Sequence, residues 1–238
     1  MKKHFTHRRG TAALLASAMA IVTAGSATAA SAVAVRSASA RITPYLMASQ
    51  QEIALARSAA PASVSKQAAV MVLTAHGYIT AAKGSNGFVC IVTRSWDNTA
   101  DVESGRFWDP KTKVPYCVNA AGARSMLAEY LQKSRWVLAG ASQAEIGERV
   151  EAARSMGEMS ASAAGAICYM MSKQGRGVAG RPGAWRPHLM FFFPKSEAPN
   201  WGDNMDGTPV FSGPADADMT MYSVLVPIWS DGSPAPGF

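Results

Sequence analysis

The sequence is poor in residues that hold metal ions or redox groups. It contains three cysteines and four histidines among its 238 residues. Only two histidines, His76 and His188, lie beyond the basic N-terminal segment, and they are far apart in the chain. A protein metal site needs three or four convergent ligands. The sequence therefore predicts no metal site and no bound cofactor.

A hydrophobic run long enough to span a membrane is also missing. The first ten residues are basic and contain no acid, and the apolar run that follows, 11–24, is shorter than the roughly 20 residues that a spanning helix needs. Small residues come next, and the triplets at 27–29 and 30–32 both fit the A-x-A pattern that leader peptidase recognises. We expect a signal peptide at 1–29, with the second triplet as the alternative cleavage position, and no transmembrane segment after its removal.

The excess of positive charge is concentrated in this expected leader. Removing Lys2, Lys3, Arg8 and Arg9 lowers the formal net charge from +7 to +3. Such a small excess does not indicate nucleic-acid binding, so no nucleic-acid partner is expected. Arg8 and Arg9 leave a twin-arginine export route open, although the next residues continue that motif poorly. By either route we expect an exported protein, in the periplasm or the extracellular medium.

The rest of the chain predicts one α+β domain. Residues 30–42 are expected to form a loose lead-in, and residues 43–238 the single domain. Short apolar runs between turn signals predict strands, and helical periodicity or capping signals predict helices at 45–59, at 120–138 and after Ser142. Strands on both sides of the central helices indicate a mostly antiparallel sheet of about six strands with three helices.

Three local patterns give sharper expectations. Residues 88–94 place apolar side chains on both faces of a strand, which predicts a central strand covered on each side. Ser142 and Glu145 have the spacing of a capping box at the start of a helix. Residues 195–218 contain no such pattern and are expected to form loops.

The odd number of cysteines predicts one disulfide and one free thiol in an exported chain. Cys90 and Cys117 flank an irregular segment, and a bridge between them would restrain that segment by roughly 3–4 kcal/mol in the chain-entropy model. We predict this pairing, with Cys168 free, while the two other pairings stay open.

A free Cys168 offers an enzymatic alternative, in which its thiol is the nucleophile and His188 is the base. This thiol-dependent hydrolase or transferase requires the two segments to pair as a hairpin, because the imidazole must contact the thiol to remove its proton. The competing interpretation is a core cysteine, since free cysteines are commonly buried and the neighbours of Cys168 are apolar. We favour the core interpretation.

A loop rich in glycine and arginine follows Cys168. The stretch 159–196 has five basic residues and no acid. Its G-x-G-x-x-G pattern at 175–180 is not followed by the helix that dinucleotide binding needs, so a flexible hairpin loop is expected there. A solvated basic face is the simplest interpretation of the charges. The functional one is an anion site whose ligands are Arg176, Arg181 and Arg186.

Tryptophans stand beside carboxylates at three places in loops, where Trp96 precedes Asp97, Trp108 precedes Asp109, and Trp201 lies two residues before Asp203. Sugar-binding surfaces combine such rings and carboxylates, but loop tryptophans also cover core edges. Trp108, Asp109 and Trp201 are therefore candidate ligand residues. A glycosidase would need two carboxylates facing each other across a cleft, which a sequence does not place.

Several longer strings resemble a group of exported bacterial proteins with no assigned activity. They are EIALARSAAP at 52–61, NGFVC at 86–90, FWDPK at 107–111, CYMMSKQG at 168–175 and PHLMFFFP at 187–194. The resemblance implies export and a single domain, and it transfers no catalytic residue. Our leading hypothesis is a non-enzymatic module that binds an anionic or glycan component of the cell envelope, with the thiol enzyme as the alternative.

Overall fold

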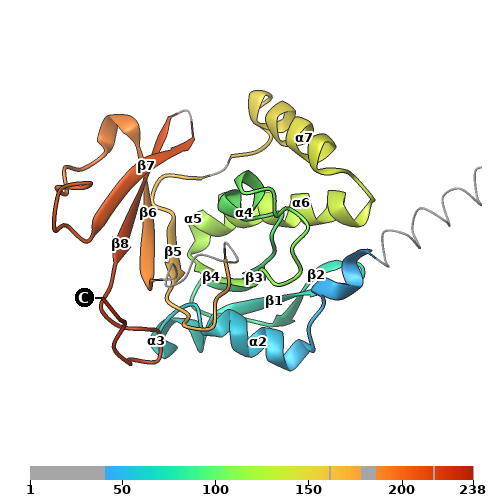
Figure 1. Ribbon diagram of the computed structural model, residues 1–238, viewed down its shortest axis with the longest axis horizontal. Coiled ribbons are helices and arrows are strands. Elements are labelled where there is room, and N and C mark those ends of the chain that lie inside the picture. The colour runs from blue at the N-terminus through green and yellow to red at the C-terminus, as the bar shows by residue number, and fades with distance from the viewer. Residues whose placement is uncertain (1–40, 161, 178–185, 217, 238) are drawn as a thin grey trace, which may run out of the picture.

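The computed structural model describes residues 41–237 except 161, 178–185 and 217 (Figure 1). The expected signal peptide lies outside the described residues, as does the expected lead-in up to residue 40. The strands are β1 (Ala69–Thr74), β2 (Gly77–Ala82), β3 (Val89–Thr93), β4 (Val114–Val118), β5 (Ile167–Met170), β6 (His188–Pro194), β7 (Val210–Asp216) and β8 (Met219–Leu225). They form one sheet in the order β2-β1-β3-β4-β5-β6-β8-β7.

The sheet is mostly antiparallel, as predicted, because only β1 and β3 run parallel among neighbouring strands. It has eight strands, where about six were expected. The prediction of loop throughout 195–218 was wrong, since this segment contains β7. Gly213 and Pro214 hide the strand pattern of β7, and a proline is tolerated there because β7 is the last strand of the sheet.

The helical segments are α2 (Ser49–Arg57), α3 (Ala62–Ser65), α4 (Thr99–Glu103), α5 (Ala120–Gly122), α6 (Ala128–Leu138) and α7 (Gln143–Ser155). A π-helical turn, η2 (Ala123–Leu127), joins α5 to α6 in one continuous helix, and η1 (Thr43–Tyr45) and η3 (Lys195–Glu197) are 3-10 turns. Counting α5–η2–α6 once, the described residues contain five α-helices, where three were expected. The short α3 and α4 carry too few residues to show a periodicity.

The helix expected at 45–59 is divided in two. Pro44 lies in the first turn of η1, as the sequence suggested, but the chain is extended between Leu46 and Ala48 before α2 begins. Tyr45 is buried and its ring lies 4.7 Å from that of Trp96. We attribute the break to this tertiary contact, which local periodicity does not record. By contrast, the Ser142–Glu145 capping box forms as predicted at the start of α7.

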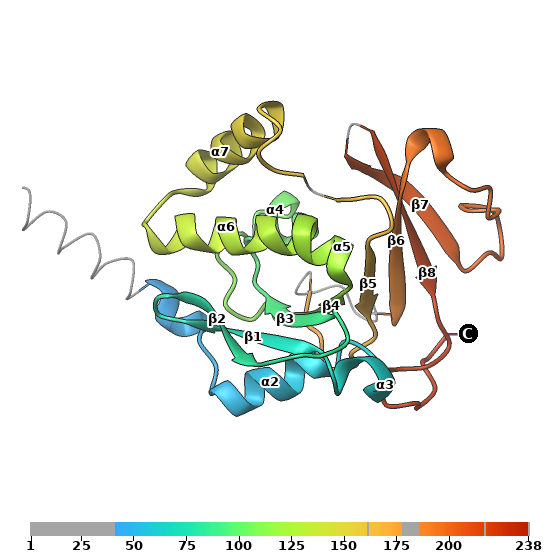
Figure 2. The same ribbon diagram turned by 180° about the vertical axis from the view of Figure 1, so that it is seen from behind.

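Helices cover both faces of the sheet at β1, β3 and β4 (Figures 1 and 2). On one face α2 packs Leu55 and Ala56 against β1, β3 and β4. On the other face the α5–η2–α6 helix packs Met126 and Leu127 against the same region of the sheet. The expectation that 88–94 forms a central strand covered on both sides is therefore confirmed. None of the described helices is long and apolar enough to cross a membrane.

The disulfide pairing predicted from the sequence is present. Cys90 on β3 and Cys117 on β4 are direct partners in the antiparallel register, and both are fully buried beneath α2. Cys168 is free and buried, as the favoured interpretation required. The bridge closes the long segment between β3 and β4, which carries Trp96 and Trp108.

The start of the continuous helix is held close to the sheet. A Cβ on Gly122 would lie only 2.9 Å from the Cβ of Val118, so glycine permits this approach. The side chain of Asn119 accepts hydrogen bonds from the backbone amides of Gly122 and Ile167 and donates one to the carbonyl of Gly165. Asn119 therefore fixes the end of β4, the first turn of α5 and the beginning of β5 relative to one another.

Candidate functional site

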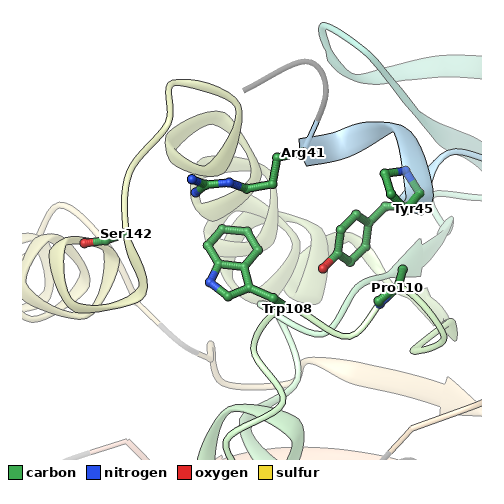
Figure 3. Close-up of a pocket in the computed structure, with 6 residues that line it drawn as sticks. Arg41, Tyr45, Trp108, Pro110 and Ser142 are labelled. Atoms are coloured by element: carbon green, nitrogen blue, oxygen red, sulfur yellow. The ribbon is translucent and has the colours of Figure 1, made fainter. Parts of the chain in front are cut away.

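A pocket of about 530 Å³ opens where three distant chain segments meet. We call it the aromatic pocket, and Figure 3 shows its side chains. η1 and the residue before its N-cap form one wall, the segment after α4 another, and the residue before α7 the third. The lining residues are Arg41, Pro44, Tyr45, Trp108, Pro110 and Ser142.

The aromatic rings of the pocket belong to a packed cluster. Trp108 contacts Phe107 and Trp96, with ring centroids 4.7 and 6.4 Å away, and Tyr45 contacts Trp96 from the other side. Trp96 is buried, and its indole nitrogen donates a hydrogen bond to Ser134 on α6. Trp108 remains 37% exposed. The pocket thus presents the partly exposed indole ring of Trp108, which is held in place by its contacts with Phe107 and the buried Trp96.

A buried ion pair anchors the wall that carries Tyr45. The guanidinium of Arg94, just after β3, lies 2.7 Å from the carboxylate of Glu52 on α2, and both side chains are fully buried. Arg94 also donates a hydrogen bond to the backbone carbonyl of Tyr45. Glu52 in turn accepts from the backbone amide of Leu73 on β1. η1, α2 and the sheet are therefore tied together behind the pocket.

Two cationic side chains lie over the two rings of the pocket. Figure 3 shows Arg41 beside the ring of Trp108. The guanidinium of Arg41 lies 4.9 Å from the Trp108 ring centroid, and the ammonium of Lys113 lies 5.8 Å from that of Tyr45. Burial, together with the nearby charge of Arg94, lowers the pKa of Lys113 to about 8. Lys113 is therefore still mainly protonated at neutral pH. The site combines aromatic surface with positive charge, which suits a ligand that has both a flat apolar face and an anionic group.

The carboxylate of Asp109, a predicted ligand residue, is used within its own loop. One oxygen accepts a hydrogen bond from the backbone amide of Lys111 and the other from the hydroxyl of Thr112. Asp109 therefore shapes the loop beside Trp108. None of the six residues that line the aromatic pocket carries a carboxylate. The pocket consequently offers no carboxylate pair of the kind that glycoside hydrolysis requires.

The three arginines predicted to form an anion site are not brought together by the described residues. Arg176 pairs through its backbone with Lys113, so the start of the glycine-rich loop runs next to the pocket lysine, while the Arg176 side chain is exposed. Arg186 lies instead near the C-terminus, with its guanidinium next to Gly237. Arg181 lies outside the described residues.

Trp201 belongs to a different part of the molecule from Trp108. Its ring packs 5.0–5.6 Å from those of Phe191 and Tyr222, and 5.5 Å from that of Phe193, on β6 and β8. These strands form the end of the sheet remote from η1 (Figure 1). The two predicted sugar-binding tryptophans therefore do not share a site.

The residues of the enzymatic alternative are neighbours, but their surroundings oppose the chemistry. β5 and β6 pair as a hairpin with Met170 opposite His188 and Cys168 opposite Met190, which puts Cys168 and His188 diagonally on one face. Cys168 is fully buried, and burial raises the pKa of its thiol well above the usual value. Burial also lowers the pKa of His188. Thiolate formation near neutral pH is therefore disfavoured.

Sequence reasoning missed most of the aromatic pocket. Arg41 was assigned to the lead-in, Tyr45 to a helix, and Ser142 to a helix cap. A local signal existed only for Trp108, in its position beside an acid in an irregular loop. Sequence reasoning noted Asp97 only as the acid beside Trp96. In the structure, burial, partly opposed by the charge of Lys133, raises its pKa to about 7.

The described residues contain no group of three or more His, Cys, Asp or Glu side chains close enough to hold a metal ion. Comparison of the chain with protein families, with curated proteins and with solved structures gave no match. The assignment of a function therefore depends on the geometry of the site itself.

Proposed function

We propose that this protein is a non-enzymatic module that binds an acidic saccharide of the cell envelope in the aromatic pocket. The single observation that carries the proposal is the placement of Arg41 and Lys113 over the rings of Trp108 and Tyr45. An aromatic ring stacks on the apolar face of a sugar, and an adjacent cation pairs with a carboxylate or phosphate on it. Trp108 and Arg41 offer these two contacts within the pocket lining, and Lys113 adds a second positive charge next to Tyr45, although it is not itself a lining residue.

The pocket also suits binding better than turnover. Its volume of about 530 Å³ is within the usual range for small-molecule sites, ~300–1,000 Å³. Its six lining residues include no carboxylate, cysteine or histidine that could act as a nucleophile or a general base. The buried disulfide supports an exported location, where envelope saccharides are encountered.

Calorimetric titration with a uronic-acid trisaccharide and with a neutral trisaccharide of equal length tests the proposal. We expect the acidic sugar to bind and the neutral one to bind at least about tenfold more weakly, because it lacks the charge-assisted contacts. Trp108→Ala should abolish measurable binding, and Arg41→Gln should reduce the preference for the acidic sugar.

Trp201→Ala and Arg176→Gln are matched controls, because they remove a second loop tryptophan and a second exposed arginine outside the pocket lining. Both should keep the affinity of the unaltered protein. Binding that is lost in Trp201→Ala but kept in Trp108→Ala would refute the assignment to the aromatic pocket. Equal affinity for both sugars would refute an acidic ligand.

A further inference from the structure

A second pocket, of about 220 Å³, lies between the η2–α6 helix and the segment that follows α7. We call it the helix pocket. It shares no lining residue with the aromatic pocket. Its polar side chains, apart from Glu129, are Arg124, Ser125, Gln132, Arg135, Glu158 and Ser160.

The helix that forms one wall is irregular at this pocket. Arg124 and Ser125 lie on the π-helical turn η2, and Gln132 and Arg135 follow on α6. π-Helical turns are rare and occur frequently at functional sites, because the inserted residue changes which side chains share a face. Ser125 donates its hydroxyl proton to the carbonyl of Ala121, which leaves its oxygen able to accept a hydrogen bond.

Glu129 belongs to the structural floor of the helix pocket. One carboxylate oxygen lies 2.6 Å from the ammonium of Lys133, and the other lies 2.8 Å from the guanidinium of Arg154 on α7. The Glu129 side chain is only 4% exposed. Its charge is therefore already paired, and its contacts hold α6 and α7 in place around the pocket.

The charges left for a ligand are two positive and one negative. Among the described residues, the side chains of Arg124, Arg135 and Glu158 form no hydrogen bond or ion pair with the protein, and all three are exposed. Unpaired guanidinium groups in a pocket favour carboxylates, which they bind through paired N–H donors. An unpaired carboxylate beside them favours an ammonium group.

We propose that the helix pocket binds a free dicarboxylic α-amino acid, such as glutamate or aspartate. Its two carboxylates would pair with Arg124 and Arg135, and its ammonium group with Glu158, so the ligand charge of −1 opposes the local charge of +1. A pocket smaller than the usual range for drug-sized molecules suits a ligand of about ten non-hydrogen atoms. The free amino acid is required, because a peptide bond would remove the ammonium group.

Titration of the full chain with glutamate, glutamine and N-acetylglutamate tests this proposal. Glutamine lacks the second carboxylate and N-acetylglutamate lacks the ammonium group. We expect each to bind at least about tenfold more weakly than glutamate, since each loses one charge-assisted contact. Arg124→Gln and Arg135→Gln should each weaken glutamate binding by a similar factor. Glu158→Gln should bring glutamate and N-acetylglutamate close to equal affinity.

Arg149→Gln, on the exposed side of α7, is the control for a general loss of positive charge and should keep full affinity. Trp108→Ala should also keep it, because the helix pocket does not depend on the aromatic pocket. Thermal unfolding of every variant would identify a loss of folding. Absence of glutamate binding to the unaltered protein, or equal binding of the three ligands, would overturn the proposal.

Discussion

The two halves of the sheet are covered in different ways. β3 and β4 lie between α2 and the α5–η2–α6 helix, and every residue of β4 is buried. In β6 and β8, only Phe192 and Tyr222 are buried, and on one face the ring of Trp201 packs against those of Phe191, Phe193 and Tyr222. The half with β3 and β4 therefore has a core between two helical layers. In the half with β6 and β8, the face that carries Phe191, Phe193 and Tyr222 is covered by the loop residue Trp201.

This difference in covering agrees with the positions of the buried ion pair, the disulfide and the aromatic pocket. The Arg94–Glu52 pair and the Cys90–Cys117 bridge lie in the doubly covered half, and the aromatic pocket is built at its outer edge. The exposed side chains of Trp201, Met205 and Phe211 belong to the other half. Fixed side-chain geometry requires packing on all sides, so a preorganised site is expected beside the doubly covered half.

The largest expected effect comes from breaking the buried ion pair. Glu52→Gln removes the charge that compensates Arg94, and an uncompensated buried charge costs about 3–5 kcal/mol. Urea denaturation should show this loss in the free energy of unfolding. The comparison is an exposed ion pair: Asp231→Asn breaks the Lys173–Asp231 pair between the segment after β5 and the C-terminal segment, and it should have no measurable effect. Similar losses in both variants would contradict the conclusion that the doubly covered half buries the Arg94–Glu52 pair without access to solvent.

The pH dependence of stability should reveal Asp97, which lies at the edge of the doubly covered half. Burial raises its pKa from 3.8 to about 7 in the folded protein, so the folded state keeps a proton that the unfolded chain releases. Its contribution to stability is therefore full below pH ~4 and is lost as the pH rises to about 7, by at most about 1.4 kcal/mol per pH unit.

Denaturation of the unaltered protein and of Asp97→Asn between pH 4 and 8 measures this contribution. The difference between their free energies of unfolding should change across that range, because only the unaltered protein carries the titrating group. The charges of Lys133, Arg94 and Glu129 act on Asp97, and all three remain in the variant. A pH-independent difference would show that the carboxyl of Asp97 is already ionised at low pH.

The smallest effect concerns Cys168, which lies on β5 where the two halves join. Because the thiol is buried and its pKa is raised, iodoacetamide should not modify it at pH 8 unless the protein unfolds. Peptide mapping after labelling under native and denaturing conditions measures this directly. Rapid native labelling at pH 6 would instead indicate an exposed thiolate and revive the thiol enzyme.

Local features of the fold were predictable because their causes are local. The capping box at Ser142 depends on two residues three positions apart, and the central position of β3 is visible in its apolar side chains on both faces. The hairpin of β5 and β6 also followed from two apolar runs around a glycine-rich loop. The edge strand β7 escaped prediction because Gly213 and Pro214 obscure its alternation.

The candidate site was predictable only in part. Trp108 was identified, but its partner rings and cations come from segments that have no mutual signal in the sequence. Asp109 and Trp201 have the residue types of a sugar site, yet one is used in its own loop and the other packs on a different part of the sheet. Residue type and spacing do not reveal which groups are already partnered.

The sequence by itself determined the α+β class, and it favoured a disulfide between Cys90 and Cys117 and a buried Cys168 over the alternatives, which the structure then confirmed. Hydrophobic periodicity indicates the fold class, because it shows which faces of each segment are buried. The odd number of cysteines predicts one disulfide and one free thiol. Only the tertiary structure decided that Arg41, Tyr45, Trp108 and Ser142 meet in one pocket. Hydrophobic periodicity shows which face of a segment is buried. Contacts between distant segments depend instead on how the whole sheet and its two helical layers pack together.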